Sequence, residues 1–422
     1  MAQQLAEKSP LAALVIHDKL ESTPHSVVKK LSVRQAEALL LEPLRAIAQY
    51  VPKIVVVVDG VDELANAEPL ILSEVTSVLC STMLDLPANV KILIFSRPEQ
   101  PITDEIPPHI KRLDLATEKS IDDVDRLVRA KLKELAKFHK WNDWPSEDQA
   151  RLLCLNAAGH LGWAMTAVRW IASQLKLKGR AKRDEVINKV SELGMGELDK
   201  LYAFILDGIL PPLEDPDRKC YIEGLKTVLG CLVVLQEPLD IGTITTLLSL
   251  DDFDVLHCMK RISSLIVDGT ESLTERTVPR AHKSVVDYIV SSRAHPDLRI
   301  DPNEHHHSLT TACFESIQRL TFNIGDITTS GPLYKKIDIS QGITYPCQWL
   351  GHHLENGGER AIQVANVVKF MKTRLLQWLE VLSLRKQVDS VAVSTLEILE
   401  KHIKVSNTSP YGIWLLRLLG QG

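Results

Sequence analysis

The sequence lacks a long apolar segment. No uninterrupted apolar run approaches about 18 residues, the length that a helix needs to cross a bilayer. The first stretch of the chain, Met1 to Pro10, carries charges and has no long apolar core. It is therefore neither a membrane anchor nor a signal peptide. We expect a cytoplasmic protein with no membrane partner.

Paired cysteines and a strong net charge are also missing. The seven cysteines are scattered singly, with no C-x-x-C pair, as is typical of a reduced intracellular protein. Lysine and arginine number 49 against 54 acidic residues, a net charge of −5. The overall charge therefore gives no reason to expect nucleic acid as a partner. An aromatic content of 5%, with Leu, Ala, Lys and Glu throughout, favours a mostly helical chain with a modest sheet.

The N-terminal part predicts an α/β arrangement. At 422 residues the chain exceeds one typical domain, so two or three units are expected. Strands and helices are expected to alternate, which implies a parallel sheet. The expected strands are 54–58, 90–95 and 111–115, and the expected helices are 69–84 and 117–140. The first strand is apolar without alternation, as a strand covered on both faces requires.

The rest of the chain is expected to be helical. Helices over 218–235, 241–250 and 254–265, a hairpin joining 265–267 to 277–278, and a helix from Ser284 resemble a winged helix. Residues 254–264 are not strongly basic, so a packing role is favoured over reading DNA. Helices are also expected over 303–320, 345–355, 361–384 and 388–404, as a docking or spacer array.

Three consecutive histidines, His305 to His307, raise the question of a metal site. Adjacent residues cannot share one face of a helix, and no cysteine is spaced to complete a site. A solvated helix is the expectation for this segment.

The ends of the first two strands carry the candidate chemistry. An Asp that closes a buried strand can hold Mg²⁺, and acids just beyond it can orient the water that attacks a phosphate. Asp59 suits the metal role, and Asp62 or Glu63 the catalytic role. Gly60 lets the loop pass close to a phosphate, and the planar donors of Arg97 suit phosphate oxygens. A strand ending in Asp-Gly can also be a plain turn, with solvated acids after it.

These residues resemble the NACHT class of signal-transducing P-loop NTPases, particularly large fungal NLR-like proteins. Residues 55–64, Val-Val-Val-Val-Asp-Gly-Val-Asp-Glu-Leu, look like its Walker B strand, and 92–99 like its sensor 1 strand. Further segments follow in the family's order, so the resemblance covers nearly the whole chain. They are its "WA" segment at 159–171, its "LDxLY" helix at 198–206, its winged-helix entry at 228–239 and its "HKSFxDF" stretch at 281–288.

The resemblance implies a fold of class α/β plus all-α. It divides the chain into a partial nucleotide-binding domain with a parallel sheet over 1–116, a helical domain over 117–212, a winged helix over 213–300 and a C-terminal helical arm over 301–422.

The resemblance also implies roles and cofactors. Asp59 would be the Mg²⁺ aspartate, Glu63 or Asp62 the water-positioning acid, and Arg97 the sensor of the terminal phosphate of ATP. His282 would contact the β-phosphate of bound ADP. A histidine at the start of a helix is alternatively a capping or packing residue.

One element of the family pattern is missing. No G-x-x-x-x-G-K-[ST] motif occurs, and no glycine is followed by lysine. That loop supplies most of the phosphate affinity and a Mg²⁺ ligand, so weak or no nucleotide binding and no sustained hydrolysis are expected. The chain is expected to begin after this loop, as a truncated gene model, a partial paralogue or a degenerate switch would.

The leading functional hypothesis is an ATP/ADP-controlled conformational switch in immune-like or non-self signalling, impaired in nucleotide binding. The alternative is a scaffold without enzymatic activity that associates with itself or with full-length NACHT relatives. A DNA-binding regulator acting through the winged helix ranks last.

Overall fold

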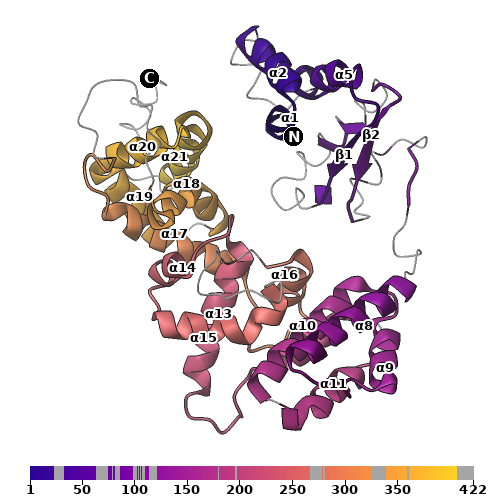
Figure 1. Cartoon of the computed structure of the whole chain (residues 1–422). Coiled ribbons are helices and arrows are strands. Elements are labelled where there is room, and N and C mark those ends of the chain that lie inside the picture. The colour runs from indigo at the N-terminus through magenta and orange to yellow at the C-terminus, as the bar shows by residue number, and fades with distance from the viewer. Residues whose placement is uncertain are drawn as a thin grey trace. The chain divides into compact units, whose positions relative to one another are not determined.

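The computed structural model shows two compact units, Met1–Thr117 and Glu118–Gly422, each of which is described by itself (Figure 1). The structure describes residues 1–22, 33–62, 75–77, 79–80, 86–97, 102, 104, 106, 110–113, 121–178, 180–194, 197–266, 278, 281–325, 339–358 and 361–405.

The first unit combines short helices with a small parallel sheet. The strands β1 (Ile54–Val58) and β2 (Val90–Ile94) pair in parallel, and Val58 lies opposite Ile94 at the last position of the register. The predicted parallel pairing of these two segments is confirmed. The helical elements are α1 (Ala2–Lys8), α2 (Pro10–Ser22), α4 (Val33–Ala36), the π-helix η1 (Glu37–Leu41) and α5 (Glu42–Ala48).

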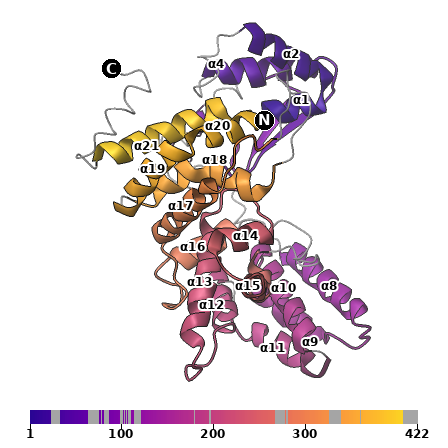
Figure 2. The ribbon, with the colours of Figure 1, turned by 90° about the vertical axis from the view of Figure 1, so that its left-hand side faces the viewer.

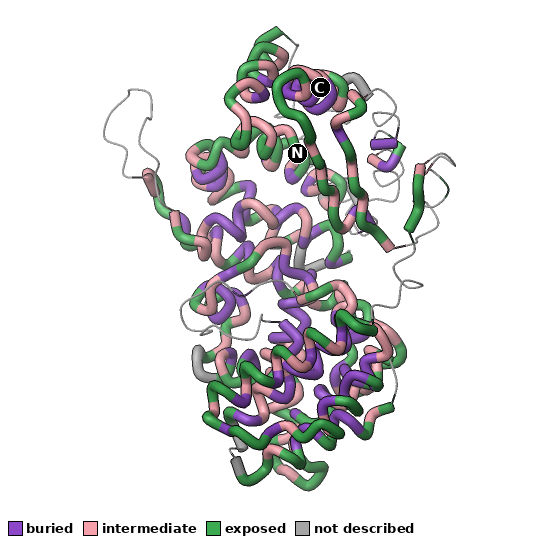
Figure 3. Tube along the Cα trace, turned by 45° about the vertical axis from the view of Figure 1, so that its right-hand side comes forward, coloured by how far each residue is buried: buried purple, intermediate pink, exposed green. Residues whose placement is uncertain are grey.

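The two strands are covered on one face. Ile54 and Val56 pack against buried Leu40 and Leu44 of the helical layer, whereas Val55 and Val57 are 48% and 58% exposed. Figure 3 shows the strands alternating between half-buried and exposed residues. The expectation of a strand covered on both faces is wrong for this unit, because the helices packed on β1 reach the even-numbered side chains only.

The other N-terminal expectations are met in part. Residues 111–113 do not form a strand, so the third strand is absent there, and residues 114 and 115 lie outside the described residues. Of the helix expected over 69–84, the described residues 75–77 and 79–80 are helical.

The second unit is helical. Its elements are α8 (Ile121–Phe138), α9 (Glu147–Ala157), α10 (Leu161–Lys178), η3 (Arg180–Lys182), α11 (Arg183–Ser191), α12 (Leu198–Asp207), α13 (Arg218–Val234), α14 (Ile241–Leu248), α15 (Asp252–Ile266), α16 (Lys283–Val290), α17 (Pro302–Gln318), α18 (Gln341–Asn356), α19 (Ala361–Thr373), α20 (Leu375–Leu384), η4 (Val388–Ala392) and α21 (Val393–Val405). The residues that the structure describes are thus mostly helical, with a small two-stranded parallel sheet in the first unit, as the sequence predicts.

Two clusters of buried side chains hold these helices together. One extends from Val124 to Tyr345 and joins helices on both sides of the boundaries expected at 212/213 and 300/301. The other extends from Cys313 to Leu399, within α17 to α21, which Figure 2 shows stacked side by side. The finer division into a helical domain, a winged helix and an arm stays a prediction.

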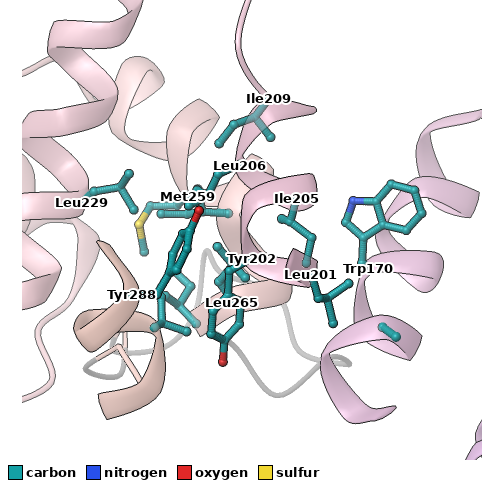
Figure 4. Packing of buried hydrophobic residues seen from close by; sticks show 14 of the residues in the cluster. Trp170, Leu201, Tyr202, Ile205, Leu206, Ile209, Leu229, Met259, Leu265 and Tyr288 are labelled. Carbon is teal, nitrogen blue, oxygen red and sulfur yellow. The ribbon is translucent and has the colours of Figure 1, made fainter. Parts of the chain in front are cut away.

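The helix α12 is central to the larger cluster. Its side chains lie between Trp170 on one side and Met259 and Tyr288 on the other (Figure 4). Tyr202 of α12 and Tyr288 of α16 are neighbours, with ring centroids 5.7 Å apart. The packing of α12 therefore links α10 to α15 and α16.

Local sequence signals explain several helix ends. Ser146 and Gln149 form the expected capping box of α9, with Gln149 N donating to Ser146 Oγ at 3.2 Å and Ser146 N donating to Gln149 Oε1 at 3.0 Å. The single helix expected over 361–384 is instead divided into α19 and α20. It is interrupted at Arg374, whose Nε donates to the Gln318 carbonyl at 2.9 Å.

The hairpin expected after α15 is corrected. Leu265 and Ile266 are the last residues of α15 rather than a strand, and they are buried in the larger cluster. Val278 instead forms an isolated antiparallel bridge with Leu239, 39 positions earlier in the chain (278 less 239), with Val278 N donating to Leu239 O at 2.6 Å. Apolar packing thus extends α15 through Leu265 and Ile266, and residues 267–277 of the expected hairpin lie outside the described residues.

Candidate functional site

The carboxyl ends of β1 and β2 lie at the same edge of the sheet. Phe95 N donates to Val58 O at 2.8 Å, and Gly60 N donates back to Phe95 O at 3.0 Å, so the two chains remain side by side beyond the strands. Gly60 has a φ of +70°, a left-handed conformation that glycine adopts without a steric penalty. The turn after β1 therefore places the following acid beside the end of β2.

Asp62 and Arg97 are direct neighbours at this edge. Asp62 Oδ1 accepts hydrogen bonds from Arg97 N at 3.2 Å and from Ser96 Oγ at 3.4 Å. Its Oδ2 lies 3.7 Å from Arg97 Nε. The Asp62 side chain is 6% exposed and that of Arg97 is 40% exposed. The structure thus brings together the acid of the first strand end and the cation of the second.

This geometry gives Asp62 a local structural task. A nearly buried carboxylate that accepts a backbone N–H forms a charge-assisted bond, and such bonds hold loops in place. Asp62 ties the segment after β2 to the turn after β1. The same contact holds the Arg97 side chain within ion-pair distance of a carboxylate, where part of its positive charge is offset.

The remaining predicted residues of this edge are less constrained. Asp59 is exposed at the end of β1, and Glu63 lies outside the described residues. Within the described ranges, no group of three or more His, Cys, Asp or Glu side chains could hold a metal ion. One exposed carboxylate and one committed to hydrogen bonds are a poor donor set for Mg²⁺, which takes its ligands in an octahedron of oxygens.

His282 lies in the second unit and caps α16. Its Nδ1 accepts a hydrogen bond from Ser284 N at 3.2 Å and lies 2.6 Å from Ser284 Oγ. Ser284 Oγ is in turn 2.8 Å from the Tyr202 hydroxyl, and burial raises the pKa of Tyr202 above its usual value. The capping alternative describes what this side chain does here. Its contact with a nucleotide stays a prediction.

The histidines of α17 correct another expectation. His306 is buried rather than solvated, and its Nδ1 lies 2.9 Å from Nδ1 of His353 on α18. Helical spacing could have revealed this, because His306 precedes Leu309 and Cys313 by three and seven positions and shares their buried face. Of the three consecutive histidines, His306 is buried, whereas His305 and His307 are partly buried.

Comparison with known families concerns the first unit. Residues 1–97 match the family model described as Nephrocystin 3, N-terminal, a domain found in NACHT-containing proteins. The match spans 97 of the 422 residues. No curated protein matches the chain. The family match suggests a NACHT or NLR-type context for the N-terminal unit.

In the ranges that the structure describes, no helix combines the length and the apolar character needed to pass through a membrane.

Proposed function

We propose that this chain is a signalling module of the NACHT type in which the nucleotide site is weakened. The single observation that carries the proposal is the parallel, in-register pairing of β1 and β2. Asp59 and Gly60 directly follow β1, and Asp62 contacts Arg97, which follows β2. Open α/β sheets bind their ligands at the carboxyl edge of the strands. The family match over residues 1–97 supports the same context.

The weakened nucleotide affinity follows from the groups that this edge of the sheet offers to a phosphate. The sequence contains no Gly-Lys pair and hence no phosphate-cradling loop. Arg97 is engaged by Asp62, and the exposed Asp59 carboxylate repels a polyphosphate unless a cation stands between them. In this proposal the site keeps the shape of a nucleotide site and has lost most of its affinity.

A calorimetric titration of the full chain with Mg·ATP and Mg·ADP tests the proposal. We expect no binding with a dissociation constant below about 1 mM, which corresponds to a binding free energy near −4 kcal/mol. The matched variants are Asp59→Ala at the site and Asp18→Ala on the exposed face of α2. Micromolar affinity that Asp59→Ala abolishes and Asp18→Ala preserves would overturn the claim of a weakened site.

A second function is favoured by the role of Asp62. Its hydrogen bonds to Ser96 and Arg97 stabilise the loop without any ligand, as a scaffold requires. Such a scaffold would associate with itself or with NACHT relatives that keep the phosphate loop.

Sedimentation of the purified chain, alone and mixed with a P-loop-containing NACHT protein, tests the scaffold. A complex that forms equally well with Asp59→Ala, with and without Mg·ATP, supports it. A complex that requires both nucleotide and Asp59 supports the switch instead.

A further inference from the structure

A chain of hydrogen bonds runs through the interior of the second unit. The Tyr345 hydroxyl lies 3.4 Å from Gln236 N, which donates to it, and 2.8 Å from Nε2 of His353. His353 Nδ1 lies 2.9 Å from His306 Nδ1. Tyr345 and His353 are fully buried, and His306 is 9% exposed.

One assignment of protons satisfies all three side chains. Tyr345 accepts from Gln236 N–H and donates its proton to His353 Nε2. His353 then carries its proton on Nδ1 and donates it to His306 Nδ1, so both imidazoles are neutral. A second proton on His306 would place an N–H group on each of the two facing Nδ1 atoms. A second proton on His353 would occupy Nε2, which would then no longer accept the hydrogen bond from the Tyr345 hydroxyl. The chain of bonds is therefore complete only with uncharged histidines.

These three hydrogen bonds lie where the two buried clusters meet. Tyr345 belongs to the cluster that starts at Val124, and its neighbour Cys347 to the one within α17 to α21. Gln236 follows α13, His306 is on α17, and His353 is on α18. The Gln236–Tyr345 bond therefore joins α18 to the segment after α13, the Tyr345–His353 bond lies within α18, and the His353–His306 bond joins α18 to α17.

Close packing at the same junction leaves no room for adjustment. A Cβ at Gly230 of α13 would clash with the imidazole of His305, and a Cβ at Gly357 would lie 2.9 Å from the backbone N of His307. The segments on both sides of His306 are therefore closely packed against α13 and the end of α18.

The ionisable groups that act on His306 and His353 do not offset a positive charge on these two rings, whereas Glu304 and Asp301 act to raise the pKa of the neighbouring His305, which burial lowers. His352 and His305 act on His306, and His352 and His306 act on His353. All of these interactions lower the pKa of the ring concerned. From α13, Lys226 acts on His305, and Glu237 in the following loop acts on Tyr345.

The pair of α17 and α18 also packs against α14, α19 and α20, and α21 packs against α18. Its Lys401 lies 3.9 Å from Glu355 of α18, and both side chains are more than half exposed. This ion pair therefore lies at the surface of the α18–α21 contact rather than beside the buried imidazoles.

We propose that His306, His353 and Tyr345 form an acid-sensitive latch. When the histidines are neutral, it holds α17 to α18 and, through Tyr345, holds α18 to the segment after α13; when the histidines take up protons, it releases these contacts.

The sign and size of the effect follow from linkage. Burial, then His352 and His305, lower the pKa of His306 from 6.5 to about 4. The released state binds more protons between these two values, so the closed state is fully favoured above pH 6.5 and weakens as the pH falls towards 4. For His306 alone, the opening constant should rise about 25-fold between pH 7.5 and pH 5.0. His353 shifts in the same direction.

Hydrogen exchange on the full chain, normalised to the intrinsic rate at each pH, tests the latch. Protection of α17 and α18 should fall at least about 25-fold from pH 7.5 to pH 5.0, while that of α10 changes little. In His306→Asn an amide replaces the ring near Nδ1 but cannot titrate. The ratio of protection at pH 7.5 to protection at pH 5.0 should be about 25-fold smaller in this variant than in the wild type. The exposed His160→Asn is the control and should keep the wild-type ratio.

A second variant covers the case in which His306→Asn does not fold. Tyr345→Phe removes the phenol that bonds to His353, so protection of α17 and α18 at pH 7.5 should fall about tenfold. Protection that is independent of pH in the wild type would overturn the proposal. An unchanged pH ratio in His306→Asn, or unchanged protection in Tyr345→Phe, would do the same.

Discussion

Replacing Asp62 by alanine should destabilise the first unit by about 2 kcal/mol. The carboxylate accepts from Arg97 N at 3.2 Å and from Ser96 Oγ at 3.4 Å, and the Asp62 side chain is 6% exposed. Hydrogen bonds to a charged group are worth about 1.5–3 kcal/mol. The contact at 3.7 Å with the guanidinium of Arg97 adds little, because that side chain is 40% exposed and solvent screens it. Two neighbouring bonds are not additive, so we take the middle of the range.

Hydrogen exchange of the peptide that covers 86–97 is the assay. A loss of about 2 kcal/mol corresponds to about 30-fold faster exchange at Phe95, whose N–H bonds to Val58 O. Tryptophan fluorescence does not report on this unit, since the first tryptophan in the sequence is Trp141. Asp62→Asn keeps one acceptor oxygen and should lose about half as much.

Asp59→Ala is the matched control. Asp59 is exposed at the end of the same strand, and surface substitutions of this kind change stability by about 0.5 kcal/mol or less. Equal exchange in Asp62→Ala and the wild type would refute the structural role of Asp62. Equal loss in Asp59→Ala and Asp62→Ala would refute the division of tasks between the two acids.

Three further predictions concern the second unit. Gly230→Ala should lower its free energy of unfolding by about 1–3 kcal/mol, measured by urea denaturation, because the new Cβ would clash with the imidazole of His305. Trp378→Phe should cost about 2 kcal/mol in the same assay, since it removes the buried 2.8 Å bond from Trp378 Nε1 to the Cys347 carbonyl. Cys220 is the exposed thiol and should react with a disulfide reagent at pH 8 in the native state. Cys347 should stay unmodified until the protein unfolds, because burial raises its pKa to about 12.

Two apolar runs in the sequence predict the parallel strand pair. Five apolar residues are followed by Asp59-Gly60, and a second apolar run is followed by Ser96-Arg97, which predicts two strands whose carboxyl ends meet. The capping signal of Ser146 and Gln149 predicted the start of α9. These predictions rest on backbone hydrogen bonding and local caps, which short segments specify by themselves.

Other features depended on contacts far apart in the sequence. The apolar run at 54–58 predicted two covered faces, but helices packed against Ile54 and Val56 leave Val55 and Val57 exposed. Leu265 and Ile266 looked like a strand because of their β-branched neighbourhood, yet packing in the larger cluster keeps them helical. In both places contacts within the folded chain decide a feature that the local sequence pattern predicts wrongly.

The site shows the same division. The sequence by itself determined which residue types stand at the two strand ends, and that no phosphate-binding loop accompanies them. Only the tertiary structure decided that Asp62 and Arg97 bind each other and that His306 faces His353. A pattern of residues fixes which side chains a segment offers, but partners 35 and 47 positions apart are chosen by packing of the folded chain.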